Sequence, residues 1–186
     1  MGKLYTESTP DLADWLVRQP LFFVATAPLA ADGHVNCSPK GLDTLRIVDA
    51  QTVAWVDLTG SGAETAAHLR ENGRIVLMFC AFEGPPKIVR LHGSGETVVP
   101  ADPRWAGLAE ALPMRPGARS IVVVRVTRIS DSCGYAVPEL AFVAQRDVLD
   151  RWVERKGAAN LPAYRREKNA VSIDGLPAPD FDGEGG

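Results

Sequence analysis

The feature that most constrains the fold is a series of strand-length apolar segments separated by turns too short to hold a crossover helix. Each segment is rich in β-branched or aromatic residues and is bounded by turn-forming residues, the pattern typical of β-strands. The predicted strands span residues 21–27, 34–40, 45–48, 52–58, 74–80, 87–99 and 120–129. Because parallel strands need long connections, these turns predict antiparallel pairing, and only residues 59–73 leave room for a helix between strands. We therefore expect a mainly β fold of six or seven antiparallel strands that form a β-barrel with peripheral helices, since closure removes exposed sheet edges.

Two residue types refine the expected strands. Pro39 cannot donate a backbone hydrogen bond, so the strand over 34–40 is predicted to lie at a sheet edge or a bend. Gly93 and Gly95 predict a bend or bulge inside the long strand over 87–99. A further short strand is predicted over 140–143.

Helix signals surround the expected barrel. Thr9 and Pro10 place a capping residue before a proline at the first helical position, and Gly73 ends a helix over 63–72. Other helices are predicted over 103–112, over 146–156 and after Pro162.

The chain is predicted to form one barrel domain with a C-terminal extension. The expected parts are a barrel over 1–145, a helical extension over 146–177 that packs on it, and a tail over 178–186. The tail is rich in Gly, Pro and acidic residues, which predicts disorder.

Composition excludes several classes. The formal net charge of −3 argues against nucleic-acid binding through a general positive field, and no apolar run approaches the roughly 18 residues of a membrane helix. Cys37, Cys80 and Cys133 form no CxxC pair and no metal-ligand pattern with the three histidines. We expect a reduced, cytoplasmic protein with no membrane, nucleic-acid or metal site.

The segment from Thr59 to Thr65 is the first candidate for chemistry, since it runs from a strand through a Gly-rich loop into a helix. Such a loop offers free backbone N–H groups at a helix N-terminus, which suit an anion such as phosphate. Ser61 and Glu64 are, however, spaced as a capping box, which would satisfy the same donors internally. Glu64 would also repel a phosphate, so both interpretations stay open.

Two strands supply further candidates. Polar residues alternate along 36–40, where Asn36, Ser38 and Lys40 share one face. In the strand over 87–99, Arg90 and His92 share a face. Taken alone, either pattern is better explained by a solvated strand face than by a ligand site.

Taken in this order, the three segments resemble the pyridoxamine 5′-phosphate oxidase-like superfamily of FMN-binding split β-barrels. The resemblance covers about residues 15–130, and its best stretch runs from Thr59 through Glu71-Asn72 to Phe79. It implies a homodimer of six-stranded split barrels with FMN in clefts at the dimer interface. Segments 132–138 and 168–177 are similar to a subgroup that is related to the true oxidase but distinct from it. The second segment is expected either to cover the cofactor cleft or only to pack on the barrel.

The chain departs from the family pattern where the FMN phosphate would bind. Classical members carry an Arg-Lys pair at the start of the helix, and Glu64-Thr65 stands there in this chain. No match to the substrate-binding ending of the true oxidase is found, so pyridoxal phosphate synthesis is not expected. The candidate cofactor-binding residues are Asn36, Cys37, Ser38, Lys40, Thr59, Gly60, Ser61, Gly62, Thr65 and Arg90.

The leading hypothesis is an FMN-dependent oxidoreductase that transfers hydride between a reduced nicotinamide or similar donor and a small-molecule acceptor. In such proteins the flavin carries the chemistry, so no catalytic side chain is assigned. The alternatives are a non-catalytic module that binds flavin, haem or deazaflavin on the same barrel, and a dimerisation scaffold without a cofactor.

Overall fold

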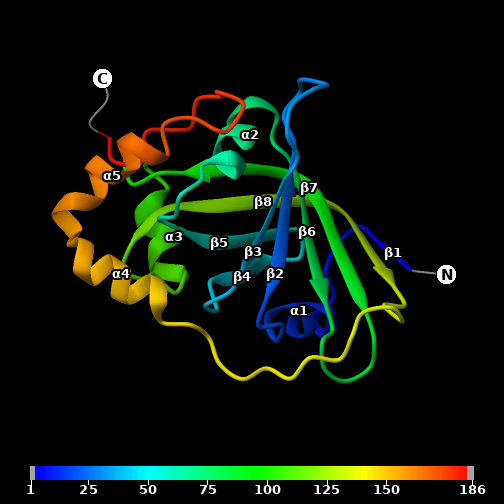
Figure 1. Ribbon diagram of the computed structural model, residues 1–186. Helices are drawn as coiled ribbons and strands as arrows, with labels where there is room; N and C mark the ends of the chain where they lie inside the picture. Colours follow the sequence, from blue (N-terminus) through cyan, green and yellow to red (C-terminus); the bar gives the residue numbers. More distant parts are fainter. Residues whose placement is uncertain (1–2, 184–186) are drawn as a thin grey trace.

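The computed structural model describes residues 3–183 and contains one antiparallel sheet that curls around a buried core (Figure 1). The strands are β1 (Leu4–Tyr5), β2 (Phe22–Thr26), β3 (Asn36–Lys40), β4 (Leu45–Asp49), β5 (Thr52–Leu58), β6 (Arg74–Cys80), β7 (Ile88–Val98) and β8 (Ala118–Ser132). The helices are α1 (Pro10–Val17), α2 (Glu64–Asn72), α3 (Trp105–Ala111), α4 (Val148–Lys156), the 3₁₀ turn Ala158–Asn160, and α5 (Leu161–Lys168).

The sheet corrects the expected strand number, because eight strands rather than six or seven pair in the described part of the chain. Their order is β3-β2-β6-β7-β8-β5-β4, with β1 added to β8. The antiparallel pairing predicted from the short turns is confirmed, as are the helices around the sheet and at its C-terminal side. The extra strand β1 has only two residues, too few for a hydrophobic pattern to reveal.

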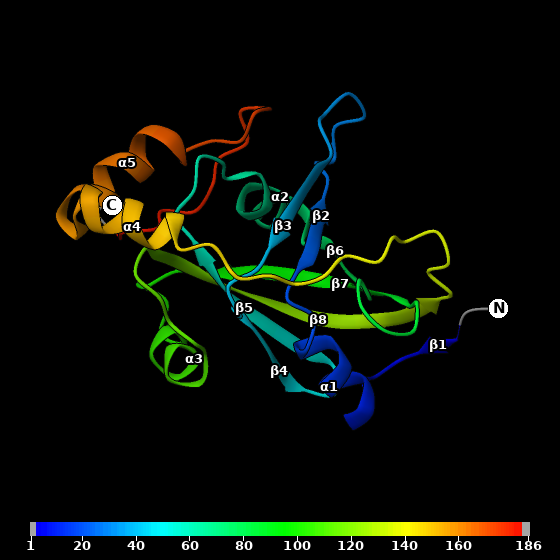
Figure 2. The same ribbon diagram turned by 60° about the horizontal axis from the view of Figure 1, so that its bottom comes forward.

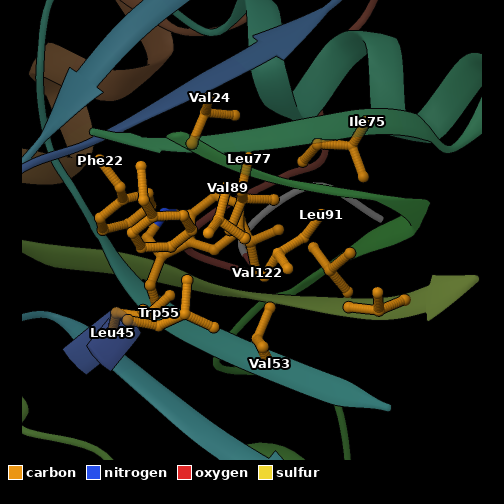
Figure 3. Packing of buried hydrophobic residues seen from close by; sticks show 14 of the residues in the cluster. Phe22, Val24, Leu45, Val53, Trp55, Ile75, Leu77, Val89, Leu91 and Val122 are labelled. Atoms are coloured by element: carbon orange, nitrogen blue, oxygen red, sulfur yellow. The ribbon is translucent and has the colours of Figure 1, made fainter. Parts of the chain in front are cut away.

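The core lies inside the curl of the sheet (Figure 3). Phe22 stacks on Phe79 with ring centroids 5.4 Å apart, and it forms a T-shaped pair with Trp55 with centroids 5.8 Å apart. Alternate residues of β2, β6 and β7 point to this side, which is the period of two that identified these strands. A second apolar cluster, containing Val56 and Ile121, lies on the other side of the sheet beneath α3.

Local signals behave largely as the sequence predicts. The Thr9 hydroxyl caps α1 by accepting from the Leu12 amide at 3.3 Å, and Gly73 ends α2 with a φ of 70°. Strand β3, which contains Pro39, is an edge strand, and the register of β7 against β8 shifts at Gly93.

Two local predictions are wrong. Residues 140–143 form no strand; the segment from Gly134 to Asp147 is an extended strap that connects β8 to α4 (Figures 1 and 2). The Ser61–Glu64 capping box is also absent, since Ala63 precedes α2 and no side chain caps its first turn.

The C-terminal segment, predicted to be a disordered tail from residue 178, lies packed against the barrel as far as it is described. Ala178 and Phe181 are buried with Ala63, Ala66 and Ala67 of the loop and helix α2. Residues 184–186 lie outside the described part of the chain. Within residues 3–183, no helix is both long enough and apolar enough to cross a bilayer.

Candidate functional site

A buried ion cluster joins the edge strand β3 to β5 and β8. Lys40 donates through Nζ to Oδ1 of Asp57 at 3.1 Å, and Arg119 donates through Nε to Oδ2 of the same carboxylate at 2.7 Å. Asp57 and Arg119 are buried, whereas the Lys40 side chain keeps about a fifth of its surface exposed. Burial by itself raises the pKa of Asp57, but the charges and hydrogen bonds of Lys40 and Arg119 outweigh it and lower that pKa to about 2. Asp57 is therefore ionised at neutral pH and held by two cations.

The loop that precedes α2 is held by its carbonyl groups. Arg119 Nη1 donates to the Gly62 carbonyl at 2.8 Å, and Asn169 Nδ2 donates to the Gly60 carbonyl at 2.9 Å. The backbone N–H groups of Gly60, Ser61 and Gly62 form no hydrogen bond with any residue between 3 and 183. The absence of the capping box thus leaves these amides available for an anion at the head of a helix, where the helix dipole favours negative charge.

Helix α5 brings a third cation to the loop. Arg165 donates through Nε to Thr59 Oγ1 at 3.0 Å, while its Nη1 pairs with Asp182. Phe181, the neighbour of Asp182, lies over the Arg119 guanidinium at 4.9 Å. Three cations and two carboxylates therefore lie around the loop and sum to one positive charge, which the Glu64 carboxylate beside Gly62 offsets. We call Lys40, Asp57, Arg119, Arg165 and Asp182 the loop cluster.

A second polar row follows the inner face of β3. Asn36 Nδ2 donates to Thr65 Oγ1 at 3.0 Å and to Thr26 Oγ1 at 3.1 Å. Thr26 Oγ1 lies 3.0 Å from Nδ1 of the fully buried His68, and burial lowers the pKa of His68. The tautomer of His68 decides whether Thr26 Oγ1 or His68 Nδ1 donates in this contact. This network ties the start of α2 to β3.

Buried polar atoms without partners mark places where a ligand could bond. Among the described residues, Ser38 Oγ, on β3 between Asn36 and Lys40, has no hydrogen-bond partner. Asn169 Oδ1, beside the loop, likewise lacks a donor. A cavity of about 1070 Å³ lies between α2, the end of β7, α5 and the segment 178–183, and both Arg165 and Asn169 line it.

The structure brings most of the predicted site residues together. Lys40 belongs to the loop cluster, and Thr59, Gly60 and Gly62 are bonded to it or to Asn169. Asn36 and Thr65 bond to each other, and Ser61 is exposed at the tip of the loop.

Two predicted residues lie elsewhere. Cys37 is exposed on the face of β3 opposite Asn36 and Ser38. Arg90 lies on the face of β7 opposite the buried Val89 and Leu91, and its Nη1 donates to Ser132 Oγ at 3.3 Å. Strand alternation explains both positions, because neighbouring side chains point to opposite faces.

Sequence reasoning missed Asp57, Arg119, Arg165 and Asn169. Asp57 could have been found from the sequence, because it is a lone acid inside the apolar strand Thr52–Leu58. A buried charge requires a partner, so its position predicts a buried ion pair. Arg165 and Asn169 carried none, because they reach the loop from more than 100 residues along the chain.

The fold defines the class of antiparallel split β-barrel proteins. A family model described as pyridoxamine 5′-phosphate oxidase matches residues 8–133. The chain belongs to this family of FMN-binding split barrels, as its sequence predicts.

Relatives extend the match beyond the barrel. The pyridoxamine 5′-phosphate oxidase family protein ustO of Aspergillus flavus is 38% identical over 194 aligned positions, which cover 95% of this chain and 78% of that protein. Among solved structures, HupZ from Group A Streptococcus is similar with a TM-score of 0.54 and 23% identity, covering 72% of this chain and 99% of that chain. An H111A variant of HupZ gives a TM-score of 0.53 and 25% identity, over 67% of this chain and 98% of that chain. The similarity to ustO includes the C-terminal extension that supplies Arg165 and Asn169.

Proposed function

We propose that this protein binds FMN at the loop cluster and acts as a flavin-dependent oxidoreductase. The observation that carries the proposal is the set of unbonded amides at Gly60, Ser61 and Gly62 beside the three cations of the loop cluster. A phosphate monoester needs both features, N–H donors that converge on it and cations that offset its charge. Membership of the pyridoxamine 5′-phosphate oxidase family supports FMN as the cofactor.

Lys40, Arg119 and Arg165 take the place of the family's Arg-Lys pair in this proposal. Each lies next to the loop, and each is already held by a carboxylate or a loop atom. Such fixed side chains lose little conformational entropy when an anion binds. Glu64 is directed back toward Gly62, where its Oε2 would lie 2.3 Å from an added Cβ, so this flexible carboxylate lies beside the loop and must move when an anion binds there.

The row on β3 provides groups for the rest of the cofactor. Ser38 Oγ and Asn169 Oδ1 lack partners and suit the polar edge of a flavin ring and the hydroxyls of a ribityl chain. Bound FMN supplies hydride transfer, and the side chains position it and balance its charge. The substrates are a reduced nicotinamide or similar donor and a small acceptor.

The active form in this proposal is a homodimer with the cofactor cleft between subunits, as the family resemblance implies. Light scattering coupled to size-exclusion chromatography measures the mass in solution. A monomer that binds FMN as tightly as a dimer would remove the interface from the proposal and leave the loop cluster.

The test compares FMN with riboflavin, which lacks the phosphate, by quenching of flavin fluorescence. FMN should bind more tightly, and Lys40→Gln and Arg165→Gln should each reduce that preference by about tenfold, the equivalent of one charge-assisted hydrogen bond. Arg90→Gln is the matched control, because the structure places Arg90 away from the loop. Failure to bind either flavin would overturn the proposal.

The alternative is a binding module without turnover, which the loss of the Arg-Lys pair favours. Stopped-flow reduction separates the two functions: an oxidoreductase reduces bound FMN with NADH or NADPH faster than the nicotinamide reduces free FMN. Absorption spectra of the purified protein distinguish flavin from haem, which gives a Soret band, and from deazaflavin.

A further inference from the structure

A separate pocket of about 900 Å³ lies between the strap, helix α4 and the turn that follows β3. This volume is in the range of small-molecule sites. Its walls are mainly apolar, and the apolar lining includes Leu21, Leu42, Phe82, Phe142, Leu149 and Trp152. Figures 1 and 2 show the strap crossing from the end of β8 to α4, and this course forms one side of the pocket.

Specific hydrogen bonds hold the strap in place. The Leu140 amide donates to the Phe82 carbonyl at 2.9 Å, near one end of the pocket. Near the other end, Gln145 donates through Nε2 to the Pro20 carbonyl at 2.9 Å and accepts from the Leu42 amide at 3.1 Å. The pocket is therefore bounded by segments that are distant in sequence but joined by side-chain and backbone hydrogen bonds.

The backbone is strained at Leu42, which lines the pocket and bonds to Gln145, and at the next residue, Asp43. Leu42 and Asp43 have φ values of 62° and 53°, in the left-handed region that non-glycine residues rarely adopt. Strain of this kind persists where surrounding contacts determine the conformation, and it is concentrated at ligand sites.

The charged side chains that line this pocket are mostly basic. Arg18, Arg146 and Arg155 line it, and none of their guanidinium groups forms a hydrogen bond or ion pair within residues 3–183. The one acid in the lining is Glu83, whose Oε1 accepts from the Phe142 amide at 3.3 Å. Guanidinium groups without partners beside apolar walls suit an organic molecule that carries a carboxylate or a similar anion.

We propose that this pocket is a second ligand site, which takes an apolar organic anion such as an aromatic or aliphatic carboxylate. It is separate from the loop cluster, since Pro39 and Gly41 border the pocket while Lys40 between them reaches the opposite face toward Asp57. The apolar body of the ligand contacts Trp152 and Leu149, and its anionic group meets the three arginines.

Two dyes test the proposal with the full-length protein. Anilinonaphthalene sulfonate is an apolar anion, and N-phenyl-1-naphthylamine is its neutral counterpart. The anionic dye should bind more tightly than the neutral dye and should quench tryptophan fluorescence. This quenching should be lost in Trp152→Phe. The triple variant Arg18→Gln, Arg146→Gln, Arg155→Gln should weaken anion binding by at least about tenfold and leave the neutral dye unchanged.

Arg151→Gln is the matched control, because Arg151 lies on α4 together with Arg155, pairs with Asp147 and does not line the pocket. Saturation with FMN should not displace the anionic dye. Equal binding of the two dyes, unchanged binding by the triple variant, or displacement by FMN would overturn the proposal. Loss of dye binding as the protein self-associates would also overturn it, and would show that a second copy covers this face.

Discussion

At the scale of single residues, Asp57 is the group on which the loop cluster depends, because it is the common partner of Lys40 and Arg119. Asp57→Asn keeps the shape of the side chain but removes the anion, so two cations lose their counter-charge. Breaking a buried ion pair in this way costs about 3–5 kcal/mol. Urea unfolding should show this loss in the free energy of unfolding. Asp147→Asn, which breaks an exposed pair with Arg151, should change it by less than about 1 kcal/mol.

The pH dependence of stability follows from the same carboxylate. Its pKa is about 2 in the folded protein against an ordinary value of 3.8, so Asp57 stabilises the fold above pH 3.8 and loses that contribution as the pH falls toward 2. The contribution is about 2 kcal/mol, and about half of it is lost by pH 3. The difference in unfolding free energy between wild type and Asp57→Asn should shrink accordingly between pH 5 and pH 3. A difference that stays constant over this range would contradict the lowered pKa.

The candidate site could be predicted in part from such residues. Alternation along β3 correctly placed Asn36, Ser38 and Lys40 on one face, since a strand has a fixed period. Asp57 was detectable as a charge in an apolar strand, but its partners were not, because pairing across a sheet depends on strand order. In the sequence, Arg90 and Lys40 are both basic residues in a predicted strand. In the structure, Arg90 lies on the face of β7 opposite the buried Val89 and Leu91 and bonds to Ser132.

At the scale of elements, the bulge between β7 and β8 depends on Gly93. The register shifts there, and a Cβ on Gly93 would lie 2.1 Å from the Arg125 carbonyl oxygen. Gly93→Ala must therefore move backbone, and we expect a loss of about 3 kcal/mol or more. Gly107 in α3 is the control, because nothing lies within 4 Å of its added Cβ. Gly107→Ala should stabilise the protein by about 0.5–1 kcal/mol. Thermal unfolding measures both, and equal effects would contradict the close approach.

Helices and strands with a clear hydrophobic periodicity could be predicted from the sequence, and segments without such a periodicity could not. The glycines of β7 signalled its bend, and Gly73 signalled the end of α2. Residues 140–143 had strand-like composition, but the Leu140 amide bonds to the carbonyl of Phe82, which lies outside the strands, so these residues remain part of the strap. The capping box failed because the side chain of Glu64 turns back toward Gly62 instead of meeting the loop amides.

At the scale of the whole molecule, the C-terminal extension completes the loop cluster. Arg165 and Asn169 reach the loop from α5 and its end, and the segment after them returns so that Asp182 pairs with Arg165. Sequence patterns described this extension as a helical appendage with a tail, because contacts over such a separation leave no local signal. The barrel alone would therefore lack one of the three cations that surround the loop.

This arrangement predicts that the extension regulates FMN binding at the proposed site. The Asp182 carboxylate occupies the Arg165 guanidinium, which a phosphate would otherwise contact. Asp182→Asn removes the competing charge, so FMN affinity should rise by about three- to tenfold, an ordinary magnitude for one charge at a partly buried pair. Riboflavin affinity should not change, because riboflavin carries no phosphate.

Glu167→Gln on the same helix is the control, since Glu167 pairs with Lys168 and does not contact Arg165 through its side chain. Equilibrium titration of each variant with both flavins measures the effect. A weaker affinity for FMN in Asp182→Asn would mean that Asp182 orients Arg165 toward the phosphate instead of competing with it. An equal change for both flavins would place its influence on the ring or on the fold. The ratio of the two affinities therefore separates competition at the phosphate from every structural effect of the substitution.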